Sequence, residues 1–230
     1  RKGWGQPAFY NTEAIVQELL NAGKSLADAR QGGASGCVET GAFGKEAYIL
    51  TGYLNLPKIL ELTLYDGFDK LSGRQLGLRT GQATEFGSFD ELFQAFRRQL
   101  RHFVDIKVRG NQIIEQLYAK QMPVPFLSVV VDDCIAKGQD YNAGGARYNT
   151  CYIQGVGIGT LTDSLAAIKV NVFDQQRFSM AALLQALDSD FADNEVIYHL
   201  VREKTPKYGN DDEVADELMK LAFSAYHAEV

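Results

Sequence analysis

A cysteine and a glutamate lie two residues apart in a Gly-rich segment of this chain. Residues 31–44 read QGGASGCVETGAFG and show no hydrophobic periodicity, which predicts a loop. Cys37, in the middle of this loop, can approach a ligand closely because glycine has no side-chain bulk and accepts positive φ. If the tip is extended, Glu39 projects to the same side as Cys37. The pair would then combine a reactive sulfur with an acid/base carboxylate.

Other interpretations of the cysteines have to be weighed against this one. A single cysteine is commonly a small buried hydrophobic residue. A thiolate nucleophile needs a base such as histidine, but every histidine of the chain falls on a predicted helix and none has an identifiable partner. These are His102, His199 and His227. Cys134 and Cys151 are distant from Cys37 and form no CxxC motif, so neither a disulfide framework nor a zinc site is predicted.

Composition limits the classes of protein that this chain can represent. Of its 230 residues, 46% are hydrophobic and 23% are charged, which is typical of a globular protein and excludes a disordered or collagen-like chain. The net charge of −6 argues against nucleic acid or an anionic membrane as partner. No segment resembles a membrane span or a signal peptide, so we expect a cytoplasmic protein. The chain begins with Arg1, and its last helical pattern continues to the end, as in an excised piece.

Helical patterns alternate with short apolar segments, which favours an α/β architecture over a helical bundle. We expect a long helix that starts after Ser88, carries an aromatic stripe and ends near Lys120, with a break near Gly110. Residues 126–131 form an apolar run that suits a buried strand or a short helix. Residues 140–159 suit a strand and turn. Further helices are predicted at 12–22, 56–64, 164–170, 180–187, 194–203 and 212–229.

Four separated segments resemble glycyl radical enzymes, the superfamily that includes pyruvate formate-lyase and the glycerol, diol and choline lyases. The first is GASGCVETGAFGKEAYILTGYLN, which resembles the active-site loop of that family. The others follow in the family's order and spacing. They are GGARYN at 144–149, DSLAAIK at 163–169 and KYGND at 207–211. The resemblance covers essentially the whole chain.

This resemblance implies a fold and a role for the two loop residues. The fold would be part of a ten-stranded α/β barrel with many helices, in which the catalytic cysteine sits on a central loop. Residues 1–230 would be the central part of the catalytic barrel domain, without the C-terminal glycyl radical domain and its RVAGY-like segment. Cys37 matches the cysteine that becomes a thiyl radical and takes hydrogen from substrate carbon. Glu39 matches the acid/base of the dehydratase and lyase branch.

The resemblance also implies a cofactor and partners for the complete enzyme. A glycyl radical would be installed by an activating enzyme that uses S-adenosylmethionine and an iron–sulfur cluster. No cofactor or metal is expected within this chain. The partners would be a small-molecule substrate, the activating enzyme and a second copy in a homodimer.

Within the family, the residues after GCVE distinguish the substrate branches. Thr40-Gly41 differs from the GCVEP start of many glycerol and choline lyases, and GCVET with the following residues looks most like the branch that dehydrates trans-4-hydroxy-L-proline to Δ1-pyrroline-5-carboxylate. Tyr53 is the best match to a tyrosine that lines the substrate pocket of that branch, and the alternative is an ordinary core tyrosine. The alternatives are a glycerol or diol dehydratase, a choline lyase, a formate acetyltransferase-like enzyme, and a non-enzymatic domain that binds a small ligand on the same scaffold.

Overall fold

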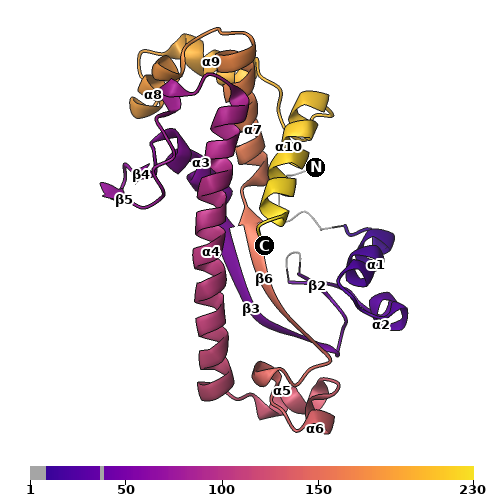
Figure 1. Cartoon of the computed structure of the whole chain (residues 1–230). Helices are drawn as coiled ribbons and strands as arrows, with labels where there is room; N and C mark the ends of the chain where they lie inside the picture. The colour runs from indigo at the N-terminus through magenta and orange to yellow at the C-terminus, as the bar shows by residue number, and fades with distance from the viewer. Residues whose placement is uncertain (1–8, 37–38) are drawn as a thin grey trace. The chain divides into compact units, whose positions relative to one another are not determined.

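The computed structural model describes residues 9–36 and 39–230 and divides the chain into two compact units. The first unit comprises residues 1–52 and 110–152, and the second comprises 53–109 and 153–230. Three elements run from one unit into the other, namely helix α4 (Phe89–Gln121) and the strands β3 (Glu46–Asn55) and β6 (Tyr148–Val156) (Figure 1). The two strands pair as a two-stranded sheet.

The first unit is built from short elements. They are α1 (Thr12–Asn21), α2 (Leu26–Arg30), β1 (Gly33–Ser35), β2 (Glu39–Gly41), α5 (Pro125–Val130), α6 (Cys134–Lys137) and a 3-10 turn at Tyr141–Ala143. The predicted helix at 12–22 is confirmed as α1, and Asn11 caps it by accepting a hydrogen bond from the Ala14 amide at 3.0 Å. The segment predicted as a loop instead contains β1 and β2, which pair antiparallel. Strands of three residues are too short to produce a detectable alternation.

The hydrophobic cluster that the described residues form in the first unit is small. Its buried members are Ala47, Cys134, Tyr141 and Ala146. The apolar run at 126–131 lies within and just after α5, so the short-helix alternative is the correct one. The expected burial is wrong, because Phe126 is 86% exposed and Val129 and Val130 are each 63% exposed.

The second unit contains most of the helical structure. Its elements are α3 (Leu56–Leu64), β4 (Phe68–Asp69), β5 (Arg74–Gln75), a 3-10 turn (Ala83–Glu85), α7 (Ile158–Ile168), a π-helical segment (Lys169–Asp174), α8 (Met180–Asp188), α9 (Glu195–Glu203) and α10 (Glu213–His227). The helix predicted at 164–170 starts earlier, at Ile158. Gly157 precedes it in the left-handed region at φ 84°, a conformation that glycine accepts without strain.

Helix α4 starts where the sequence predicts. The Ser88 hydroxyl accepts a hydrogen bond from the Glu91 amide at 3.2 Å and so caps the first turn. The expected break near Gly110 is wrong, because the helix continues without interruption to Gln121. One glycine costs a helix about 1 kcal/mol relative to alanine, which does not end a helix whose aromatic stripe is packed along one face.

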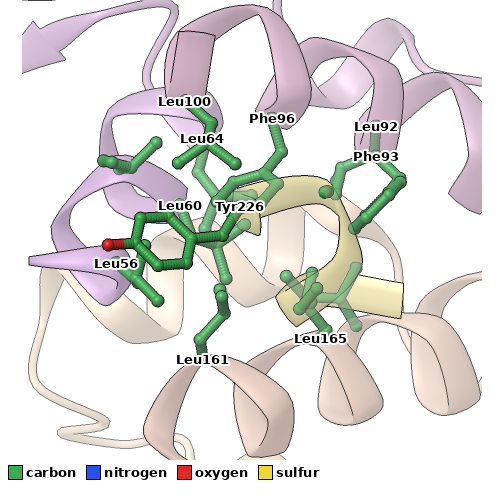
Figure 2. Close-up of a cluster of buried hydrophobic side chains, with 14 of the residues drawn as sticks. Leu56, Leu60, Leu64, Leu92, Phe93, Phe96, Leu100, Leu161, Leu165 and Tyr226 are labelled. Carbon is green, nitrogen blue, oxygen red and sulfur yellow. The ribbon is translucent and has the colours of Figure 1, made fainter. Parts of the chain in front are cut away.

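That stripe anchors the large hydrophobic core of the second unit. Phe96 and Leu100 of α4 are fully buried, as are Leu161 and Leu165 of α7. Figure 2 shows these side chains gathered with the leucines of α3 and with Tyr226 of α10. The core therefore joins helices that are far apart in the sequence.

The described residues thus form a mixed α/β structure, as predicted. Within the described ranges, we find no helix that combines the length and apolar character needed to cross a membrane.

Candidate active site

Glu39 is the first residue of β2, and its main chain is held in a short antiparallel pairing. Cα partners in this pairing are Ser35 with Glu39, Ala34 with Thr40, and Gly33 with Gly41. Cys37 and Val38, between the two strands, lie outside the described residues. The Glu39 side chain is half-buried. The hairpin therefore fixes the backbone of the predicted acid/base residue directly beyond the predicted cysteine.

The Glu39 carboxylate lies against the backbone of Gly36, the residue before Cys37. A Cβ atom placed on Gly36 would be 2.4 Å from Glu39 Oε2, and Gly36 has a φ of 57°. Any other residue would push the carboxylate away and would also strain the backbone. Glycine at this position thus allows the Glu39 carboxylate to lie close to the backbone.

Strand β2 is tied to its surroundings through Thr40. The Tyr152 hydroxyl, on β6, donates a hydrogen bond to the Thr40 carbonyl oxygen. The Thr40 hydroxyl in turn donates to Glu18 Oε1 of α1 at 2.6 Å. One residue of β2 is therefore linked to both a helix and a strand.

A second attachment is made by Glu46, the first residue of β3, whose side chain is fully buried. Its Oε2 accepts a hydrogen bond from the Ala42 amide at 2.7 Å. Its Oε1 accepts one from the Thr150 hydroxyl at 2.5 Å and lies 3.0 Å from Lys24 Nζ. Buried charges require such pairing and hydrogen bonding, because removing them from water is otherwise costly.

Two stacked tyrosines lie beside these carboxylates. The rings of Tyr48 and Tyr152 are 5.5 Å apart at an interplanar angle of 15°. Burial, reinforced by the negative charge of Glu46, raises the pKa of Tyr48 to about 12 and raises the pKa of Tyr152 above its ordinary range. Both phenols are therefore neutral at physiological pH. The Tyr152 hydroxyl donates a hydrogen bond to Thr40, whereas the buried Tyr48 hydroxyl has no hydrogen-bond partner among the described residues.

Gly41 provides the space that this arrangement requires. A Cβ atom at Gly41 would lie 2.1 Å from the Tyr48 hydroxyl oxygen and 2.6 Å from Glu46 Oε2. The last residue of β2 can thus be no larger than glycine while these two side chains keep their positions.

A third cluster in the first unit centres on Asp28 of α2. Its carboxylate pairs with Lys45 Nζ at 2.5 Å, accepts a hydrogen bond from the Tyr148 hydroxyl at 2.8 Å and lies 3.4 Å from Arg147. The hydrogen bonds from Lys45 and Tyr148 hold the pKa of Asp28 well below its usual range. Arg147, in the GGARYN segment, also pairs with Asp133 at 3.0 Å. This arginine is therefore part of a structural ion-pair network.

Tyr53, the predicted substrate residue, lies on β3 in the second unit, and its side chain is 65% exposed. Glu39 belongs to the first unit. Glu39 thus begins the short strand β2, and Tyr53 lies near the end of β3. The roles of both residues stay predictions.

Sequence reasoning missed the residues that hold the hairpin. Glu46 and Lys24 look like ordinary surface charges in the sequence, and Tyr152 looks like one aromatic residue of a strand. The only available signal was the position of Glu46 at the start of an otherwise apolar strand, EAYIL. That signal does not identify the partners, which are distant in sequence.

In the part of the chain that the structure describes, no group of three or more His, Cys, Asp or Glu side chains is arranged to hold a metal ion. Cys134 is buried, and burial raises the pKa of its thiol. Cys151 is half-buried and hydrogen-bonds to Glu115.

Comparison with known proteins agrees with the resemblance found in the loop. The model of a family described as pyruvate formate lyase-like matches residues 1–230. The chain is 64% identical over 230 residues to trans-4-hydroxy-L-proline dehydratase of Clostridioides difficile, with all of this chain and 29% of that protein covered. The chain thus spans less than a third of the length of this relative.

Solved structures give the same result for the fold. The crystal structure of hydroxyproline dehydratase from Clostridioides difficile with trans-4-hydroxy-L-proline bound matches with a TM-score of 0.96 and 64% identity, over 100% of this chain and 29% of that one. The glycerol-bound form of the B12-independent glycerol dehydratase from Clostridium butyricum matches with a TM-score of 0.91 and 38% identity, over the same shares. The described architecture is therefore that of a segment of these enzymes.

Proposed function

Because this chain belongs to the pyruvate formate lyase-like family, we propose that it is the central part of the catalytic barrel of a glycyl radical dehydratase. The longer protein removes water from trans-4-hydroxy-L-proline and yields Δ1-pyrroline-5-carboxylate. One observation carries this proposal. The Gly36-Cys37-Val38-Glu39 sequence is followed by a tethered strand, and the Glu39 carboxylate lies against the residue before the cysteine. The high identity to a hydroxyproline dehydratase supports the choice of substrate.

In this proposal Cys37 and Glu39 have separate roles. A glycyl radical in the longer protein, outside this chain, would supply the acceptor for the hydrogen atom of the Cys37 thiol. As a thiyl radical, the Cys37 sulfur takes a hydrogen atom from substrate carbon and later returns one to the product radical. That return leaves the thiyl radical, and the Cys37 thiol is restored when the sulfur takes back the hydrogen atom that it first gave up. Glu39 donates a proton to the departing hydroxyl, which leaves as water, and recovers that proton from the substrate. The sum is the loss of one water molecule with no net oxidation.

The other parts of the proposal concern residues and partners that the chain alone does not contain. Tyr53 lines the substrate pocket. The activating enzyme, which uses S-adenosylmethionine and an iron–sulfur cluster, acts on the C-terminal radical domain of the longer protein. That protein is a cytoplasmic homodimer.

The central experiment is substitution of Cys37 in the activated longer protein under anaerobic conditions. Cys37→Ser is expected to abolish turnover of hydroxyproline while the glycyl radical signal in electron paramagnetic resonance still forms. The matched control is Cys151→Ser, because Cys151 is a half-buried cysteine of β6 that hydrogen-bonds to Glu115. Full activity in Cys37→Ser would refute the proposal.

Glu39→Gln tests the acid/base role separately. The variant keeps the size of the side chain but cannot donate a proton as a carboxylic acid, so turnover should fall by about 100-fold or more. An unchanged rate would show that Glu39 is not the acid/base group.

Substrate choice is tested by supplying hydroxyproline, glycerol and choline in turn. We expect product from hydroxyproline only. Product from glycerol alone would favour the second candidate, a glycerol dehydratase, to which the chain is also structurally similar. Binding without any product would favour the small-ligand binding domain.

A further inference from the structure

The Lys24–Glu46 ion pair is exceptional among the ion pairs of the described residues because both partners are almost completely buried. The side chains of Lys24 and Glu46 are 6% and 0% exposed, respectively. Taking two charges out of water costs several kcal/mol for each ion, and pairing alone does not reliably recover that cost. A buried ion pair is thus weak evidence for stability, which raises the question of what this pair does.

The partners of Glu46 indicate the answer. They come from three separate segments: Lys24 from the connection between α1 and α2, Ala42 from the residue directly after β2, and Thr150 from β6. Each bond uses the direction of a carboxylate lone pair, so the three segments are held in a defined geometry. An apolar side chain would fill the space without fixing their relative positions.

The segment that gains most from this arrangement is β2. Ala42 is three residues after Glu39, about 10 Å along an extended strand. Strand β2 has only three residues, so a shift of its end moves the whole strand. Tyr152 and Glu18 hold the middle of the strand through Thr40, and Glu46 holds its end.

We infer that Glu46 is a positioning residue, whose buried carboxylate fixes the end of β2 and thereby sets the place of the Glu39 carboxylate beside Gly36. The inference rests on the proposed function insofar as it concerns catalysis. Glu46 itself does not touch the reacting atoms in this account. Lys24 balances the buried charge that the three-way attachment requires.

The first test measures position without using activity. Glu46→Gln in the longer protein replaces one carboxylate oxygen with an NH2 donor, so the side chain can no longer accept from the Ala42 amide at one end and pair with Lys24 Nζ at the other. Hydrogen–deuterium exchange at residues 39–42 is therefore expected to become faster. The matched control is Asp69→Asn, which removes the charge of another buried carboxylate, paired with Lys58 in the second unit. Unchanged exchange at 39–42 in Glu46→Gln would overturn the inference.

The second test separates positioning from stability. A displacement of about 1 Å at a reacting group can reduce a rate by about 100-fold, so Glu46→Gln should lower kcat by about 10- to 100-fold while KM for hydroxyproline changes much less. The curve of kcat against pH should have the same shape as in the wild type, because the acid/base group Glu39 is unchanged. The glycyl radical signal should form as in the wild type. Asp69→Asn should lower the unfolding temperature and leave kcat unchanged.

The outcomes distinguish this inference from the proposed function. A kcat unchanged in Glu46→Gln would overturn the positioning role, even if stability fell. If the wild type does not dehydrate hydroxyproline but the variant exchanges faster at 39–42, the proposed function is wrong and the positioning of β2 stands. If Glu46→Gln does not fold, the double variant Lys24→Met/Glu46→Gln is tested in the same assays, because it removes both charges of the buried ion pair.

Discussion

Each of the two compact units is stabilised internally by a different kind of interaction. The second unit has a continuous hydrophobic core in which Phe96, Leu161 and Leu165 are fully buried. The first unit has a small hydrophobic cluster and relies on buried or half-buried polar groups, centred on Glu46 and Asp28. The hairpin that carries Glu39 belongs to this polar unit.

This difference indicates a division of tasks within the chain. Apolar packing is strong but non-directional, and so it stabilises helices without aligning particular atoms. Hydrogen bonds to charged groups are directional and have defined lengths. A strand of three residues, such as β2, needs the second kind of support, whereas a set of long helices needs the first.

The largest expected effect on stability is in the second unit. Phe96→Ala removes a fully buried ring that packs against Phe93 at 5.7 Å between centroids. We expect the free energy of unfolding to fall by about 3–5 kcal/mol, measured by denaturant titration of the longer protein. The turnover of the remaining folded protein should stay near the wild-type value. A large loss of kcat in fully folded Phe96→Ala would contradict the view that the apolar core supplies stability without aligning the site.

In the first unit, Asp28→Asn should destabilise the protein in a way that depends on pH. The pKa of Asp28 is lowered in the folded state, so its contribution is fully present above the ordinary aspartate pKa of about 3.9 and is lost as the pH falls from there through the lowered value. The stability difference between wild type and Asp28→Asn should thus be largest near neutral pH and shrink below about pH 4. Denaturant titrations at several pH values would measure it, and a difference that is independent of pH would contradict the ionic role.

Helix caps should have equal effects in the two units, because a cap is a local interaction. Asn11 accepts from the Ala14 amide in α1, and Ser179 accepts from the Ala182 amide in α8. Asn11→Ala and Ser179→Ala should each cost about 1 kcal/mol. Denaturant titration of the two variants compares them, and a several-fold larger cost in one unit would show that its cap also supports tertiary structure.

The smallest expected effect concerns an exposed ion pair. Asp105 and Arg109 of α4 lie 3.6 Å apart, with side chains 62% and 76% exposed. Asp105→Asn should change the free energy of unfolding by no more than about 0.5 kcal/mol, because water and salt screen the pair. Thermal unfolding at low and high salt checks this value. A loss of unfolding free energy comparable to that in Asp28→Asn would mean that burial does not explain the difference between the Asp28–Lys45 and Asp105–Arg109 pairs.

The sequence predicts the helical second unit better than the polar first unit. Caps, prolines and apolar periodicity are local signals, so α3, α4 and α8 are found close to their predicted places. The exposure of the apolar side chains of α5 could not be predicted in the same way, because an apolar run in the sequence does not reveal which residues pack against it. The uninterrupted passage of α4 through Gly110 depends on packing along the whole helix.

For the candidate site, the sequence identifies the reactive residue types but not their supports. Cys37 and Glu39 stand out because they occur together among glycines, and their roles stay predictions. Lys24 and Tyr152 carry no local signal, and the position of Glu46 at the start of an apolar strand does not identify its partners. Their roles arise only when segments distant in the sequence come together.

That distance has a consequence for the order of folding. Glu46 and its partner Thr150 are 104 residues apart, and Thr40 and its partner Tyr152 are 112 residues apart. During translation, Glu39 therefore leaves the ribosome long before the strand that holds it. Contacts at such separations form slowly, because the loop between them must first be closed. The final geometry of β2 is thus acquired later than that of the helices, whose hydrogen bonds are local.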